Sequence, residues 1–326
     1  MVGVDVTPPL RVVYFGTPAF AVPALEALLA SPHHVLAIVT QPDRPRGRGQ
    51  RVSDMPVKEL ALGRGLPVLQ PDRLKDEAFL DAFRALNADI GVVAAYGKIL
   101  PDAVLAAPRL GLINVHASLL PRHRGAAPIH RAIIAGDRET GVTIMRIVRE
   151  LDAGPMVDRR TLPIGDDETS ADLEARLARL GAERLVETMT QIAKGTAREV
   201  PQDDRLATYA PRLTKDDGAM DWTQPAPALH NLVRGLHPWP HAFSYLDQAR
   251  YLIHRTRVAG HGASGAAPPG SVIEASGETL IVAAGAGTAL RILEIQPEGR
   301  RAMSARDFLA GHRPAPRFRF SRTPLA

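Results

Sequence analysis

The sequence predicts an α/β protein with a mostly parallel sheet covered by helices on both faces, followed by a small β-barrel. The chain has 326 residues, which is long for a single hydrophobic core. Its first half alternates short apolar runs with segments of helical periodicity, and its last third carries short strand-like runs between Gly and Pro turns. We therefore expect one domain over residues 1–195, a linker over 196–224 and a second domain over 225–326.

The first domain is expected to begin with strands that are apolar on both faces, as parallel strands between two helical layers are. The expected strands cover residues 11–16, 34–41, 66–69, 89–97 and 111–116. The expected helices cover 20–31, 54–64, 76–86 and 127–136. After them, residues 140–148 and 154–164 are long enough to pair as a hairpin, and an amphipathic helix over 170–195 completes the domain.

The second domain follows a polar, turn-rich stretch, residues 196–224, whose composition is typical of a partly ordered linker. A helix over 226–236 precedes five short strands between residues 242 and 297, and a last helix is expected over 303–311. Five short strands separated by tight turns indicate a small barrel of OB-like type. Such barrels commonly present one face to oligonucleotides.

Composition narrows the class of protein. The chain contains no cysteine, which excludes disulfides, a thiol nucleophile and Cys-ligated metal centres. The N-terminal sequence has no secretory pattern, and no apolar run is long enough to cross a membrane, so we expect a cytoplasmic protein. The net charge of +5 lies in the last third, where residues 208–326 carry 14 Lys and Arg against 9 Asp and Glu. This imbalance suggests a polyanionic partner or, equally well, an arginine-rich coding bias.

The motifs of several common enzyme classes are absent from the sequence. The turn FGTPAF after the first strand has one glycine where a dinucleotide fingerprint has three, and no P-loop is present. HEXXH and paired-histidine metal spacings are absent, and no G-x-S-x-G elbow supports a serine hydrolase.

Two polar residues at the end of the strand over 111–116 form the best candidate site. Asn114 and His116 are two residues apart and so share one face of the strand, at the carboxyl end where open parallel sheets bind ligands. An amide and an imidazole there can donate hydrogen bonds to an oxygen that gains negative charge. Asp152, in a loop between two expected strands, is the candidate to orient the imidazole and accept a proton. From the residues alone, simple turn-capping roles for all three stay open.

The stretches around these residues resemble a known family. GLINVHASLLPRHRGAAPIHRAIIAGDRETGVTIM, with LDAGPM after it, is similar to the folate-dependent formyltransferases. Other stretches resemble the methionyl-tRNA formyltransferase family within that group, and they span the chain almost end to end. They are YFGTPAFAVPALEALL, VTQPDRPRGRGQ, PVKELA, AAYGKILP, DWTQPA, HPWP and GRRAMSARDFL.

The resemblance implies a Rossmann-like formyltransferase domain, an OB-like tRNA-binding domain and a reaction. The formyl group of 10-formyltetrahydrofolate would pass to the α-amine of methionine on initiator methionyl-tRNA, with no metal and no stable protein partner, in a monomer. It implies catalytic roles for Asn114, His116 and Asp152. The folate would lie against the turn formed by Ser118, Leu119, Leu120 and Pro121.

Basic residues matching the family would bind tRNA. Residues 41–51 form an expected exposed loop, QPDRPRGRGQR, because two prolines and two glycines prevent regular structure. The candidate tRNA-binding residues are Arg44, Arg46, Arg48, Arg51, Arg300 and Arg301. Solvated charges with no partner are the alternative for each of them.

Two other functions stay open beside the favoured one. The chain could be a small-molecule formyltransferase or a formyltetrahydrofolate hydrolase, with an accessory C-terminal domain. It could also be an RNA-binding protein without catalysis, in which the candidate catalytic residues would be dispensable.

Overall fold

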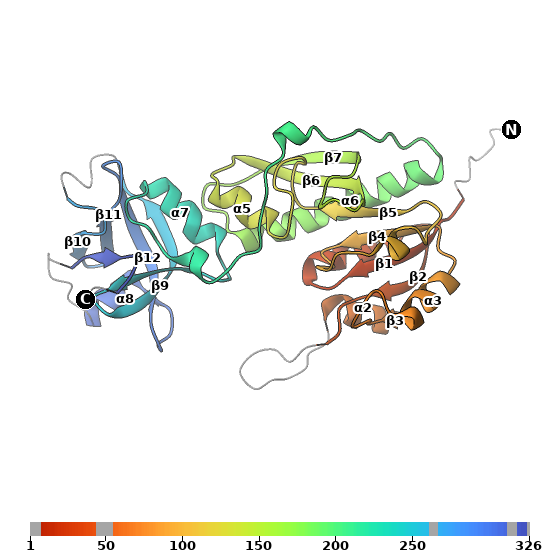
Figure 1. Cartoon of the computed structure of the whole chain (residues 1–326). Helices are drawn as coiled ribbons and strands as arrows, with labels where there is room; N and C mark the ends of the chain where they lie inside the picture. The colour runs from red at the N-terminus through yellow and green to blue at the C-terminus, as the bar shows by residue number, and fades with distance from the viewer. Residues whose placement is uncertain (1–7, 44–54, 261–266, 312–317, 325–326) are drawn as a thin grey trace. The chain divides into compact units, whose positions relative to one another are not determined.

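The computed structural model describes four stretches of the chain, in which two compact units form (Figure 1). The described residues are 8–43, 55–260, 267–311 and 318–324. Unit 1 consists of Met1–Pro128, Glu139–Pro163 and Glu174–Ala210. Unit 2 consists of Ile129–Arg138, Ile164–Leu173 and Pro211–Ala326.

Unit 1 is built on a seven-stranded sheet with the strand order β3-β2-β1-β4-β5-β6-β7. The first five strands in this order pair in parallel, and β6 and β7 are each antiparallel to the strand before. The bounds are β1 Arg11–Gly16, β2 His34–Val39, β3 Val68–Leu69, β4 Ile90–Ala94, β5 Leu112–His116, β6 Glu139–Arg146 and β7 Met156–Pro163.

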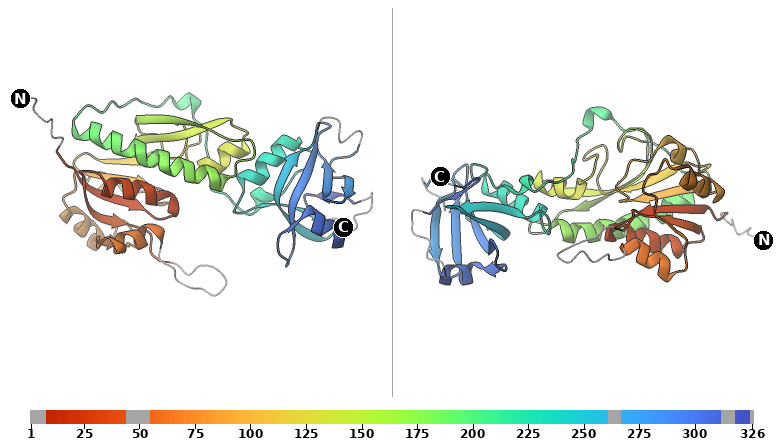
Figure 2. Two further views of the ribbon diagram at one scale, coloured as in Figure 1. Left: turned by 180° about the vertical axis from the view of Figure 1, so that it is seen from behind. Right: turned by 60° about the horizontal axis from the view of Figure 1, so that its bottom comes forward.

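Helices connect these strands, as expected where parallel strands follow one another. They are η1 Ala19–Ala21, α1 Val22–Leu29, α2 Pro56–Gly63, α3 Glu77–Ala85, α4 Asp102–Leu105, α5 Pro128–Ile134 and α6 Ser170–Ala193. By the division above, α5 after Pro128 and the first four residues of α6 belong to unit 2. The long helix α6 runs along the sheet (Figure 2). Gly181 allows its close approach, because a Cβ at this position would lie 2.7 Å from Cγ1 of Val115 in β5.

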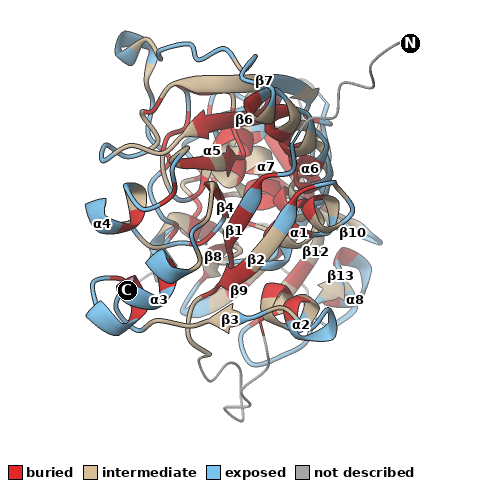
Figure 3. Cartoon of the chain, turned by 90° about the vertical axis from the view of Figure 1, so that its right-hand side faces the viewer, coloured by how far each residue is buried: buried red, intermediate tan, exposed pale blue. Residues whose placement is uncertain are grey.

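The central strands β1 and β4 of the unit 1 sheet are almost wholly inaccessible (Figure 3), whereas the edge strand β7 is partly exposed. One apolar cluster joins Phe15 of β1 and Leu112 of β5 to Phe83 of α3. Val115, by contrast, points to the opposite face, toward α6. Because side chains alternate along a strand, Asn114 shares the face of Leu112.

Unit 2 contains a second sheet, antiparallel throughout, with the order β10-β11-β12-β9-β8-β14, and β13 pairs with β12. Its strands are β8 Ala242–Leu246, β9 Ala249–Val258, β10 Val272–Ser276, β11 Thr279–Ala283, β12 Ala289–Pro297, β13 Met303–Ser304 and β14 Phe320–Ser321. The helices are α7 Ala226–Gly235 and α8 Ala305–Gly311. Its core centres on aromatic rings, in which Tyr251 contacts Phe308 and Phe320 edge to face.

The predicted fold class is confirmed: a mostly parallel α/β sheet is followed by a curled antiparallel sheet. The expected hairpin is present, because Thr143 of β6 pairs with Arg159 of β7 in an antiparallel ladder. Short elements escaped the sequence patterns, among them α4, with four residues, and β13 and β14, with two each. Within the described residues, no helix combines the length and the apolarity that a membrane crossing requires.

Candidate active site

Strand β5 carries Asn114 and His116 to the carboxyl end of the parallel part of the sheet. Asn114 pairs with Val93 of β4 on one side and with Met145 of β6 on the other, so its position is held by two ladders. Its side chain is partly exposed, and its amide has no hydrogen-bond partner among the described residues. An amide held at a strand end without a partner is available to a ligand.

His116 is buried, with 5% of its surface exposed, and both ring nitrogens face acceptors. Nε2 lies 3.0 Å from the carbonyl oxygen of His123, and since a carbonyl oxygen only accepts, Nε2 donates this bond. Nδ1 faces the carboxylate of Asp152 at 3.7 Å, which is beyond direct hydrogen-bond length. The imidazole is thus oriented between a backbone carbonyl and the candidate proton acceptor.

Asp152 lies in the loop between β6 and β7, and its backbone has φ +49°, in the left-handed region. Short polar residues such as Asp tolerate this conformation better than most side chains. The Oδ2 atom that faces His116 also accepts a hydrogen bond of 2.8 Å from the backbone N–H of Gly125. This bond fixes the carboxylate beside the imidazole.

A segment far along the chain completes the site. Gln202 donates from Nε2 to the carbonyl oxygens of Asp152 and Gly154, at 2.8 Å each. Its Oε1 accepts from Nε and Nη2 of Arg124, whose side chain is buried. The amide of Gln202 therefore ties the loop of Asp152 to the loop that follows β5.

The backbone of residues 208–210 is hydrogen-bonded to the loop that follows β5. The N–H of Arg124 donates to the carbonyl of Thr208, and the N–H of Ala210 donates to the carbonyl of Arg124, at 2.8 and 2.7 Å. Gly125, with φ +122°, faces Ala210 so closely that a Cβ would lie 2.8 Å from its carbonyl oxygen. Residues 202–210, which the composition assigned to a linker, thus contact both loops of the site within unit 1.

The sequence did not identify Gln202 or the side-chain role of Arg124. The two are 78 positions apart and have no motif in common, so no local pattern signals their contact. The polar composition of the segment around Gln202 resembles that of any connecting loop.

Side-chain hydrogen bonds of Ser118 and Thr143 stabilise the turn after His116. Ser118 donates from Oγ to the carbonyl of Arg122 at 2.6 Å. Thr143 donates from Oγ1 to the Ser118 carbonyl and accepts from the Leu120 N–H. The side chains of Ser118, Leu120 and Pro121 are buried, whereas Leu119 is partly exposed. Of the four predicted folate-binding residues, three therefore shape the turn and only Leu119 offers an accessible side chain.

The structure describes two of the six arginines that were predicted to bind tRNA. Arg44, Arg46, Arg48 and Arg51 lie outside the described residues. Asp43, just before them, is held by Lys58 and Gln70, whose hydrogen bonds lower the pKa of its carboxyl. Arg300 and Arg301 lie in unit 2 on the exposed turn between β12 and β13. Neither side chain forms an ion pair with a described residue.

This arrangement combines a free amide donor, an oriented imidazole and a carboxylate at one sheet edge. An amide and an imidazole can stabilise negative charge on an oxygen, and a carboxylate can accept a proton. These are the requirements for attack of an amine on a carbonyl carbon.

Two family models and several known proteins match this chain. The chain matches the family model "Formyl transferase" over residues 10–189 and the model "Formyl transferase, C-terminal domain" over residues 212–313. It is 51% identical over 303 residues to the methionyl-tRNA formyltransferase of Methylococcus capsulatus, covering 93% of this chain and 97% of that protein. Identity to the methionyl-tRNA formyltransferase of Caldanaerobacter subterraneus is 49%, with the same coverage.

Solved structures share the fold at low identity. A sugar 3N-formyl transferase, WlaRD, aligns with a TM-score of 0.68 and 16% identity, over 90% of this chain and all of that one. HypX from Aquifex aeolicus in complex with tetrahydrofolic acid aligns with a TM-score of 0.62 and 16% identity, over 93% of this chain and 47% of that one.

Proposed function

The chain belongs to the methionyl-tRNA formyltransferase family, and from that premise we propose that it formylates the α-amine of methionine on initiator methionyl-tRNA. The donor is 10-formyltetrahydrofolate, and the products are N-formylmethionyl-tRNA and tetrahydrofolate. The observation that carries the proposal is the unpartnered Asn114 amide beside the His116 and Asp152 pair. In this proposal residues 1–195 catalyse the transfer and residues 225–326 bind tRNA.

The residues at the end of β5 fit such a donor. The partly exposed Leu119 offers an apolar contact for a flat pterin, and the Asn114 amide is free to bind the formyl oxygen. When bound, the donor supplies an electrophilic formyl carbon on a nitrogen that can leave.

Asn114 and Asp152 act on different atoms during the transfer. The neutral amine of methionine forms a bond to the formyl carbon, and Asn114 donates a hydrogen bond to the oxygen that becomes negative. Asp152, directly or through water, takes the proton that the attacking nitrogen loses. The bond from the formyl carbon to the folate nitrogen then breaks as the proton held by Asp152 passes to that nitrogen, directly or through water, which returns the carboxylate to its starting state.

His116 acts with Asn114 on the same oxygen after exchanging one of its present contacts. Its Nε2 is bonded to the His123 carbonyl, whereas its Nδ1 contact to Asp152 is long at 3.7 Å. A small rotation of the ring toward the substrate therefore breaks one hydrogen bond and gains another. In the proposal, Asp152 also steadies the ring during this exchange.

Gln202 is proposed as a positioning residue, since its amide holds two backbone carbonyls of the Asp152 loop. Replacing Gln202 by Ala should lower kcat about 10- to 100-fold, because a displacement of about 1 Å at a catalytic group has costs of this size. The KM for the folate donor should stay nearly constant. Steady-state formylation kinetics measure both constants.

A second variant, Gln202→Glu, replaces the donating amide with a carboxylate oxygen. Its carboxylate can still bind Arg124 but cannot donate to the carbonyl oxygens of Asp152 and Gly154. Both variants should therefore be slow. Normal kcat in either one would show that this clamp is not needed for catalysis.

The basic loop is proposed to bind the acceptor end of the tRNA, since an arginine can contact phosphates or guanine edges. Replacing Arg44 by Ala should raise the KM for tRNA about 5- to 150-fold and leave the KM for the donor unchanged, as a lost contact of 1–3 kcal/mol predicts. Arg84→Ala, on the exposed surface of α3, is the matched control. An unchanged KM for tRNA in the Arg44 variant would remove the loop from the proposal.

Arg300 and Arg301 are proposed to contact the tRNA backbone, which their exposure and lack of an ion pair with described residues allow. Such contacts make tRNA binding weaken steeply with salt.

The proposed reaction takes place in the cytoplasm, where charged initiator tRNA is used. It needs one copy of the chain and no metal at the site.

An assay with alternative acceptors tests the proposed function. With 10-formyltetrahydrofolate as donor, initiator methionyl-tRNA should be formylated, whereas free methionine and uncharged tRNA should not react. Efficient formylation of a free amine, or release of formate to water at the same rate with and without tRNA, would identify a small-molecule formyltransferase or a hydrolase instead.

A further inference from the structure

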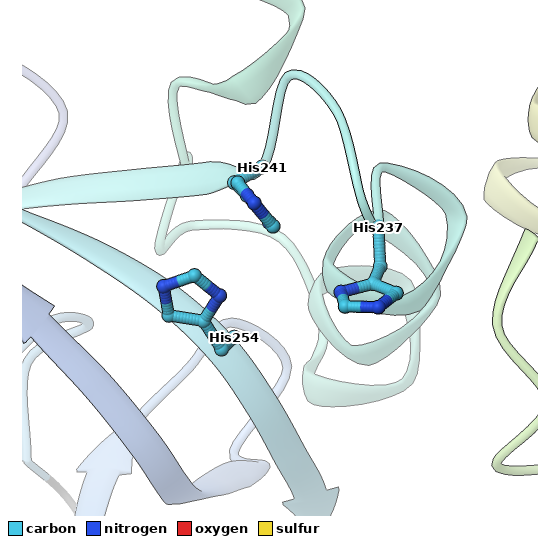
Figure 4. Close-up of side chains that lie close together, drawn as sticks. All are labelled: His237, His241 and His254. Atoms are coloured by element: carbon cyan, nitrogen blue, oxygen red, sulfur yellow. The ribbon is translucent and has the colours of Figure 1, made fainter. Parts of the chain in front are cut away.

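Three histidines that the proposed reaction does not use converge in unit 2. They are His237, in the turn after α7, His241, just before β8, and His254, in β9. One nitrogen from each ring lies within 4.8 Å of the other two, and Figure 4 shows the three side chains close together. In the described part of the chain, no other group of three His, Asp or Glu side chains meets this criterion.

The fold brings these rings together through strand pairing. Ala242 of β8 pairs with Ile253 of β9, so their neighbours His241 and His254 lie opposite each other. The centroids of those two rings are 4.4 Å apart, and the centroid of His237 is 5.6 Å from that of His241. The sequence alone did not suggest the cluster, because His254 joins it only through this register.

Gln296 orients the third ring. Its Nε2 donates to the carbonyl of Arg300 at 2.7 Å, which leaves its Oε1 as the acceptor facing Nε2 of His254 at 2.8 Å. Nε2 of His254 therefore carries the proton, and Nδ1 keeps its lone pair. Metal-binding histidines are oriented in this way, by a hydrogen bond from the nitrogen that does not bind the metal.

The backbone conformation of His241 decides which substitution can test its side chain. Its φ is +68°, in the left-handed region, where glycine is the residue without steric cost. Histidine is among the non-glycine residues that adopt this conformation most often, and His123 of this chain does so as well, with φ +59°. Glycine at this position would keep the backbone conformation and remove the imidazole.

We propose that His237, His241 and His254 form a binding site for a divalent transition metal, with Zn²⁺ as the ion that fits best. Neutral imidazoles are preferred ligands of Zn²⁺, Cu²⁺ and Ni²⁺. In a tetrahedral zinc site with Zn–N bonds of about 2.0–2.1 Å, ligand nitrogens are about 3.3 Å apart, which these side chains reach by small rotations. A water molecule takes the fourth position.

The bound ion would join the turn after α7 to the paired strands β8 and β9. This role is structural and independent of formyl transfer, since all three ligands belong to unit 2 and the proposed catalytic residues belong to unit 1. The metal site can therefore be tested independently of the proposed function.

Titration with Zn²⁺ tests the site in the full-length chain, freed of metal by a chelator and carrying no histidine tag. In competition with a chromophoric chelator, the wild type should bind one ion per chain with a dissociation constant of about 1 μM or below. Co²⁺ in place of Zn²⁺ should give the visible absorption of a tetrahedral complex.

His241→Gly is the decisive variant, because glycine suits the left-handed backbone and so removes a ligand without straining the fold. It should weaken Zn²⁺ binding at least about 100-fold, and Gln296→Ala should weaken it about 10-fold. Zn²⁺ should raise the midpoint of thermal unfolding of the wild type and leave that of His241→Gly unchanged.

The matched control is His34→Ala, which removes an exposed histidine at the start of β2 in unit 1 and should bind Zn²⁺ as the wild type does. Binding in the wild type that is no tighter than in His241→Gly would overturn the proposal. A loss of binding in His34→Ala equal to that in His241→Gly would overturn it as well.

Discussion

Replacing Asp152 by Asn is expected to lower kcat for formyl transfer by about 10²- to 10⁴-fold, the usual contribution of a general base. Asparagine keeps an oxygen that can accept the hydrogen bond from the Gly125 N–H, which now measures 2.8 Å to Oδ2. It cannot accept the proton of the attacking amine at neutral pH. The variant therefore separates the chemistry of the carboxylate from its structural role.

The controls for Asp152→Asn are its stability and a distant variant. Its midpoint of thermal unfolding should lie close to that of the wild type, since the loop keeps its bond to Gly125. Asp81→Asn, on the exposed surface of α3, should leave kcat unchanged. A fall in kcat of less than tenfold in Asp152→Asn would exclude this carboxylate as the proton acceptor.

Replacing Asn114 by Ala is expected to lower kcat by about 10²- to 10³-fold, as removal of one oxyanion donor does. The loss should come without a loss of stability, because the Asn114 amide has no hydrogen-bond partner among the described residues. Truncation therefore leaves no buried group unpaired. Steady-state kinetics and thermal unfolding, measured on the same preparation, reveal this combination.

A variant of His116 should behave differently. His116 is buried and bonded to the His123 carbonyl, so His116→Ala should lose both stability and activity.

The control for Asn114→Ala is a second asparagine variant, Asn87→Gly, at an exposed position with φ +48°, which should leave kcat unchanged. A normal kcat in Asn114→Ala would show that the formyl oxygen is stabilised elsewhere.

The main strands and helices follow from local patterns in the sequence. Runs such as residues 11–16 and 89–97 are apolar on both faces because helices cover both sides of the sheet, and they form β1 and β4. The hairpin β6–β7 is likewise local, since its strands are adjacent in sequence. Helix α4 and strands β13 and β14 are too short for a periodic pattern to develop.

The sequence suggested three residues of the candidate site, Asn114 and His116 from their strand and Asp152 from the loop between two expected strands. Asn114 and His116 share one strand, and period-two alternation places them on one face. The contact of Gln202 with Asp152 depends instead on the path of residues 202–210 across unit 1. The details at His116 also needed the structure, since its bond to the His123 carbonyl depends on a backbone turn at His123 with φ +59°.

A single-turnover measurement tests the central claim most directly. Enzyme in excess would be mixed with initiator methionyl-tRNA and 10-formyltetrahydrofolate labelled in the formyl group, and the label would be followed by rapid quench. The account predicts that the label appears on the methionine amine, and that Asn114→Ala and Asp152→Asn slow this step. Label that appears as free formate, or transfer that is equally fast in those variants, would contradict the account.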